Sequence, residues 1–265
     1  MIFVTVWYSM AGLSVLPDGP SATVVRCGCG VTISAGRRKR EVRNKTVNRW
    51  IIYLTGMFIL TFGLYLNARC GLGTSALLGV AYVCGEAWGI SFGDASLVVY
   101  MLYISGQFLV RGKNRQWRDL LQLPVGVIIS QTFNLLDRIL PYESFQNSLW
   151  TKLLVLLGAI LCNGVGASLS VNMRLVPTPG DGIVQALSDV TGKEQGLMKN
   201  IFDVCSVTTT VVLSFALLGR LDGVGIGTLA AMLLVGRVIS LMNHLFREKM
   251  LRCAGMEHTM RREPV

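Results

Sequence analysis

Two carboxylates stand out because they lie in stretches of the chain that are otherwise mostly apolar. Asp203 lies inside an apolar segment that begins at Met198, and Asp181 lies in a segment broken by proline and glycine. An ionisable group inside a membrane is costly, so it is a candidate for binding a cation or carrying a proton. Arg237, in the last apolar segment, completes this candidate coupling pair. A purely structural ion pair between Asp203 and Arg237 is the alternative.

Two short segments have the composition of helix starts and are candidate solute-binding sites. Thr74, Ser75 or Asp181 can act as an N-cap, and a proline suits the first helical turn. A helix start carries free backbone N–H groups and a partial positive charge, which at membrane depth would bind a polar or anionic group. Ordinary caps at the membrane surface are the alternative. The candidate solute-binding residues are Gly73, Thr74, Ser75, Pro179, Gly180 and Asp181.

Patterns typical of catalysis and of metal binding are missing. No metalloprotease, serine-hydrolase or phosphate-loop motif occurs, and both histidines, His244 and His258, lie in the C-terminal region. Cys27 and Cys29 lack a second pair of metal ligands nearby. The sequence therefore predicts no catalytic residue, no metal and no cofactor.

The elements that carry these residues are those of a polytopic membrane protein. Hydrophobic residues make up 52% of the 265 residues and charged residues 15%, against about 25% charged residues in a soluble domain. We therefore expect an all-α protein embedded in the lipid bilayer. The predicted spans are residues 50–68, 95–110, 120–140, 150–171, 198–218 and 225–246.

The net charge of +10 comes mainly from basic runs between and beside these apolar segments. This distribution follows the positive-inside rule and does not indicate a nucleic-acid partner. Two topologies compete, because the short stretches 74–90 and 177–192 either cross the membrane or turn back within it. Eight spans would place the basic residues of 111–118 outside, whereas six spans place them inside. We predict six spans plus two re-entrant or half-helices, with both termini in the cytoplasm.

Short motifs recur along the chain in the same order. The pattern Leu-x-x-Asn-x-Arg at 64–69 returns at 169–174, and Gly-x-x-x-Gly at 89–93 returns at 192–196. Each motif is weak alone, but the shared order and nearly constant offset predict an internal duplication. The two related, inverted halves are residues 49–140 and 150–246.

Basic segments flank the membrane domain. Residues 1–48 form a basic extension that contains Gly, Pro and Ser, and we expect it to be poorly ordered. Residues 49–246 form the membrane domain, and residues 247–265 form a basic cytoplasmic tail. A homo-oligomer or another membrane partner is compatible with these features.

The stretch 49–246 resembles the YczE/YyaS/YitT family of bacterial integral membrane proteins. The resemblance rests on Gly-Leu-Gly-Thr-Ser at 71–75, Pro-Gly-Asp-Gly at 179–182 and Gly-Ile-Gly-Thr at 225–228. It implies a protein of the bacterial cytoplasmic membrane and supplies no substrate. The chain departs from the family in its long basic extension, and it carries Asp203 where relatives often have Glu.

These features predict a transporter or permease for a small polar or anionic solute. The solute would bind between the two broken segments, and Asp203 would carry a coupling proton or cation. A non-transporting scaffold, sensory or assembly subunit is the first alternative. An intramembrane enzyme is the second, and it would require Asp181 and Asp203 to meet. We expect no enzymatic activity.

Overall fold

The computed structural model describes residues 35–112, 117–140 and 148–256. The chain divides into two compact units, Met1–Lys45 and Thr46–Val265. In the first unit, the described residues form the beginning of helix α2 (Ala35–Arg69). Most of the predicted N-terminal extension, including Cys27 and Cys29, lies outside the described residues. The second unit contains all the other elements discussed below.

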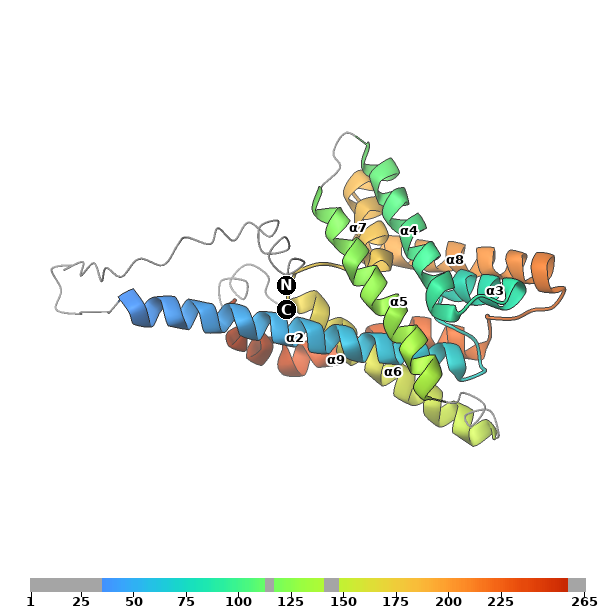
Figure 1. Cartoon of the computed structure of the whole chain (residues 1–265), viewed down its shortest axis with the longest axis horizontal. Coiled ribbons are helices and arrows are strands. Elements are labelled where there is room, and N and C mark those ends of the chain that lie inside the picture. The colour runs from blue at the N-terminus through green and yellow to red at the C-terminus, as the bar shows by residue number, and fades with distance from the viewer. Residues whose placement is uncertain (1–34, 113–116, 141–147, 257–265) are drawn as a thin grey trace. The chain divides into compact units, whose positions relative to one another are not determined.

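The described part of the chain is helical and contains no strand (Figure 1). Six of its helices are long and apolar enough to cross a membrane, which confirms the all-α membrane fold. A short 3-10 helix, η2 (Trp117–Leu121), leads into α5. The long helices after α2 are α4 (Phe92–Arg111), α5 (Gln122–Ile139), α6 (Leu149–Asn172), α8 (Gln195–Leu218) and α9 (Ile226–Cys253).

Two short helices, α3 (Gly79–Trp88) and α7 (Pro179–Thr191), interrupt this series. α3 has 10 residues and α7 has 13, so at 1.5 Å per residue they are about 15 and 20 Å long. Neither reaches across a hydrocarbon core of about 30 Å. The topology with six spans and two half-helices therefore holds, and the one with eight spans does not.

The same order of elements occurs twice in the described chain: long, short, long, long. α2, α3, α4 and α5 make up the first series, and α6, α7, α8 and α9 make up the second. This order fits the proposed duplication, which stays a prediction. Two boundaries differ most from expectation: α2 begins at Ala35, before the predicted start of the first span at residue 50, and α9 continues to Cys253, beyond the predicted end of the last span at residue 246.

Glycines let α2 and α6 cross closely and in opposite directions. A Cβ added to Gly166 would overlap the backbone of Leu60 and Gly56, while one added to Gly63 would lie 2.7 Å from the backbone nitrogen of Asn163. Positions later in α2 thus face positions earlier in α6. Small residues of this kind allow the backbones of membrane helices to approach each other. The two series of helices therefore begin with antiparallel spans.

Ion pairs join the ends of the helices. Arg69 at the end of α2 makes a bidentate pair with Asp137 of α5, with N–O distances of 2.7 to 3.0 Å. Arg111 at the end of α4 is buried and binds Asp119 at 2.7 Å and Asp189 of α7 at 2.8 Å. The second of these contacts fixes the end of α7 to α4.

The α2–α6 crossing can be tested by replacing Gly166 with leucine. Since the added side chain has no room beside Leu60, we expect a loss of about 1–3 kcal/mol, or roughly 3–10 °C in the thermal midpoint. Gly158→Leu on the same helix is the control, because a Cβ there meets nothing within 4 Å. Thermal unfolding in detergent measures both, and equal losses would contradict the close crossing.

Candidate solute site between the two short helices

The first broken segment, residues 70–78, is fixed to the start of α9. The backbone N–H of Thr74 donates to the carbonyl of Gly223 at 2.9 Å, and that of Gly227 donates to the carbonyl of Leu72 at 2.8 Å. Gly73 has a φ of 110° and lies directly against Gly225. Glycine is required at position 73 for two reasons. A side chain would strain the backbone at this φ, and it would collide with the start of α9.

Thr74 and Ser75 do not cap the first short helix, contrary to the sequence-based expectation. Leu78 is the N-cap of α3 and makes no side-chain cap bond. The carbonyl of Ser75 instead accepts a hydrogen bond from the N–H of Leu78 at 3.0 Å, which forms a turn ahead of the helix. Thr74 is fully buried and donates its hydroxyl hydrogen to the carbonyl of Ser75.

The second broken segment begins a regular helix. Thr178 is the N-cap of α7, and its hydroxyl accepts from the N–H of Asp181 at 3.2 Å. Pro179 occupies the first helical position, as predicted. Asp181 is therefore the third helical residue and not the N-cap. Its carboxylate accepts from the Thr178 hydroxyl at 2.8 Å and lies near the positive end of the helix.

Two side chains of α2 hold the loop between α6 and α7. Arg49 donates to the carbonyl of Met173 at 2.6 and 2.8 Å and to that of Arg174 at 3.1 Å. The hydroxyl of Tyr53, which is buried, donates to the carbonyl of Val176 at 2.8 Å. These bonds supply partners for carbonyl groups that the end of α6 leaves free.

The two broken segments meet. Gly180 is the second residue of α7. A Cβ added to it would lie 3.0 Å from Cδ1 of Leu77, in the turn before α3. The hydroxyl of Tyr103, on α4, donates to the carbonyl of Leu77 at 2.8 Å. Gln107, one turn further along α4, donates to the carbonyl of Pro179 at 3.3 Å. α4 therefore contacts both segments and holds them side by side.

Three ionisable residues cluster beside this meeting point. The ammonium group of Lys199, on α8, lies 3.7 Å from the carboxylate of Asp181. Asp203 follows Lys199 by four residues, one helical turn along the same face. Asp203 is 8% exposed, and its Oδ1 has no hydrogen-bond partner. A buried carboxylate oxygen without a partner is costly, and it is available to a bound proton, cation or hydrogen-bond donor.

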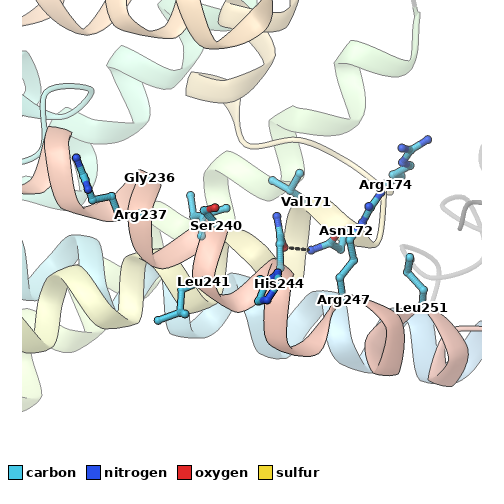
Figure 2. A pocket seen from close by; sticks show the side chains of 12 residues that line it. Val171, Asn172, Arg174, Gly236, Arg237, Ser240, Leu241, His244, Arg247 and Leu251 are labelled. Atoms are coloured by element: carbon cyan, nitrogen blue, oxygen red, sulfur yellow. Dashed lines mark hydrogen bonds between the residues drawn. The ribbon is translucent and has the colours of Figure 1, made fainter. Parts of the chain in front are cut away.

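The structure brings together only part of the predicted site. Gly180, Asp181 and Asp203 lie in or beside the cluster, whereas Gly73 and Thr74 face the start of α9. Arg237 makes no ion pair with Asp203. It lines a groove between α6 and α9 instead (Figure 2).

Lys199 and Tyr103 belong to the site and were not predicted. In the sequence, Lys199 lies at the end of a predicted span, where a charged residue is common. Its spacing of four residues from Asp203 could have indicated that the two side chains lie on one face of a helix. The position of Tyr103 depends on how α4 packs, which the sequence pattern does not reveal.

Among the described residues, no group of three or more His, Cys, Asp or Glu side chains could hold a metal ion. The cluster itself consists of two carboxylates, one ammonium group and neighbouring hydroxyl and carbonyl groups. Such a set can bind polar groups and exchange protons.

Comparison with known proteins fits this architecture. Residues 47–244 match a family of unknown function, DUF6198. An uncharacterised membrane protein, YczE of Bacillus subtilis (strain 168), is 24% identical over 199 residues, covering 75% of this chain and 86% of the relative. No solved structure matches. The resemblance to the family of YczE is confirmed, and the chain belongs to the DUF6198 family.

Proposed function

We propose that this protein carries a small polar solute across the membrane, with the solute bound where the two broken segments meet. One observation supports this above the others: the turn before α3 and the start of α7 touch beside the partly exposed ion pair of Asp181 with Lys199 and the buried carboxylate of Asp203. Broken helices in matching positions of two inverted halves are typical of transporter binding sites. The antiparallel α2 and α6 support such an inverted arrangement.

The charges of the cluster favour a neutral or cationic solute over an anion. When both are ionised, Asp181 and Asp203 set two negative charges against the one positive charge of Lys199. The start of α7 offers little to an anion, because Thr178 accepts from the N–H groups of Asp181 and Gly182. Proline has no N–H, and the Asp181 carboxylate already occupies the positive end of the helix. We therefore narrow the solute class to polar molecules that donate hydrogen bonds.

Asp203 is the residue that we propose for coupling. Its unpaired Oδ1 can take a proton or contact a cation, while Lys199 balances the charge of its neighbour Asp181. Exchange of a proton at Asp203 would change the cluster from one net negative charge to neutral. A change of that size next to the solute site would alter solute affinity.

The proposed location is the bacterial cytoplasmic membrane, with both termini in the cytoplasm. The support is the distribution of basic residues. In the six-span topology, Arg49, Arg174 and Arg247 all lie on the same side of the membrane. In this orientation the α3 segment enters from outside and the α7 segment enters from the cytoplasm.

The cluster can be tested by removing its positive charge. Lys199→Met leaves two carboxylates without their cation, and we expect the thermal midpoint at pH 7 to fall by about 3–6 °C, because the partners are partly exposed. Adding Asp203→Asn should restore part of the loss. Lys193→Met, at an exposed position nearby, is the control. A midpoint that did not change in Lys199→Met, or no recovery in the double variant, would contradict the proposed balance of charges.

The solute class can be tested by a thermal-shift screen of the detergent-purified protein. Polar neutral and cationic solutes should raise the thermal midpoint more often than anions do. Asp181→Asn and Asp203→Asn should abolish each such shift, since both remove a charged acceptor from the site. Glu248→Gln should leave it intact, because Glu248 is an exposed carboxylate at the far end of α9.

A hit should then be transported into proteoliposomes by the wild-type protein and not by Asp203→Asn. Transport that survives both aspartate substitutions would contradict the site. A complete panel without a hit, together with stable co-purification of another membrane protein, would favour the scaffold alternative.

A further inference from the structure

Helix α7 is tied to α4 near its start and at its end. The carbonyl of Pro179 accepts a hydrogen bond from Gln107 at 3.3 Å, and the carboxylate of Asp189 pairs with Arg111 at 2.8 Å. The charged cluster lies beside the start of α7, so the rest of α7 leads from the cluster toward the cytoplasm in the proposed orientation. The contact at its end therefore controls the cytoplasmic side of the proposed solute site.

The two carboxylates that pair with Arg111 differ in exposure. The side chains of Arg111 and Asp119 are 5% and 10% exposed, whereas that of Asp189 is 50% exposed. If Asp189 leaves, water hydrates it, and Arg111 keeps its buried partner Asp119 at 2.7 Å. An ion pair with an exposed partner contributes little to stability, whereas breaking a buried pair is costly. The Arg111–Asp189 contact can therefore open while the Arg111–Asp119 contact stays closed.

The chain that follows this contact has room to move. Residues 189–197 are all exposed, and a Cβ added to Gly192 or Gly196 would meet nothing within 4 Å. Among the residues that the structure describes, Asp189 makes the only ion pair or hydrogen bond between this stretch and α4. Exposed stretches with few contacts open most easily. Gly192, the C-cap of α7, can absorb the change in backbone direction.

The two short helices pack in matching ways. A Cβ added to Gly79 of α3 would lie 2.6 Å from Oγ1 of Thr210, on α8. One added to Gly182 of α7 would lie 2.9 Å from Nε2 of Gln107, on α4. The two glycines are 103 residues apart, and so are their two partners. Each short helix thus packs against the third helix of the other series, and the two ends can be compared position by position.

The ion pair at the end of α7 lacks a counterpart at the end of α3. At the same spacing of 103 residues, Ser214 corresponds to Arg111. Glu86 corresponds to Asp189. Ser214 is buried, and its hydroxyl accepts from the N–H of Asp222 at 2.6 Å. Glu86 is exposed and forms no ion pair within the described part of the chain. The two short helices therefore differ in whether charge ties their ends to the neighbouring span.

We propose that the Arg111–Asp189 ion pair is the cytoplasmic gate of the solute site. When the pair is closed, it holds the end of α7 against α4 and blocks the route from the cluster to the cytoplasm. When it opens, the end of α7 leaves α4 while Gln107 still holds the start of the helix. Gating of this kind at a broken helix is one route to alternating access. This inference rests on the proposed transport function, because the gate serves the same site.

The test places a cysteine behind the gate, in the full-length protein with its seven native cysteines replaced. Ala186 is fully buried, and its spacing from Gly182 and Asp189 puts it on the face of α7 that meets α4. Ala186→Cys is labelled with a membrane-impermeant maleimide in inside-out vesicles, and the rate is measured. We expect Asp189→Asn to raise this rate about fivefold, because labelling follows the fraction of open molecules.

Two controls accompany this variant. Asp189→Glu keeps the charge and should label at the rate of the parent protein. Glu86→Gln, at the corresponding position of α3, should do the same. An unchanged rate in Asp189→Asn, or an equal increase in either control, would overturn the gate.

Thermal unfolding shows whether each protein is folded. If Ala186→Cys unfolds, Ile183→Cys replaces it as the reporter, because Ile183 is buried and packs against Gly106 of α4. The labelling rate needs no solute. An unchanged rate would therefore contradict the gate alone, whereas a lack of transport in proteoliposomes would contradict the proposed function.

Discussion

The backbone polar groups of the two broken segments impose the main constraint on this fold. Within a bilayer no water can pair with a free N–H or carbonyl, so irregular backbone survives only where the protein supplies partners. The start of α9 supplies them for residues 72–74, and Arg49 and Tyr53 supply them for residues 173–176. Each broken segment is thus held by a span from the other half of the chain.

The charged cluster follows from that arrangement. Once α7 starts inside the membrane domain, its third residue, Asp181, is carried there as well and needs a cation. Lys199 of α8 provides it at 3.7 Å, while Asp203 on the same helix keeps an oxygen without a partner.

Much of the fold could be predicted from the sequence, because the length of an apolar run decides whether a helix can span. The two short helices could be predicted from the length of their segments, and Pro179 at a helix start from the preference of proline for the first turn. The N-cap Thr178 was missed although it precedes Asp181 by three residues, the spacing of a capping motif. Pairing across helices could not be predicted. The surroundings of Thr74, Arg237 and Tyr103 depend on how each helix is rotated about its axis, which weak apolar periodicity leaves open.

Contact between the two broken segments is the central claim, and cysteine cross-linking tests it most directly. In a protein whose seven native cysteines are replaced, Leu77→Cys is combined with Gly180→Cys and treated with a short thiol cross-linker in the membrane. We expect efficient cross-linking of this pair. We expect none when Leu77→Cys is combined with Gly192→Cys at the far end of α7, where a side chain would meet nothing within 4 Å. Failure of the first pair, or equal cross-linking of both pairs, would contradict contact between the two broken segments.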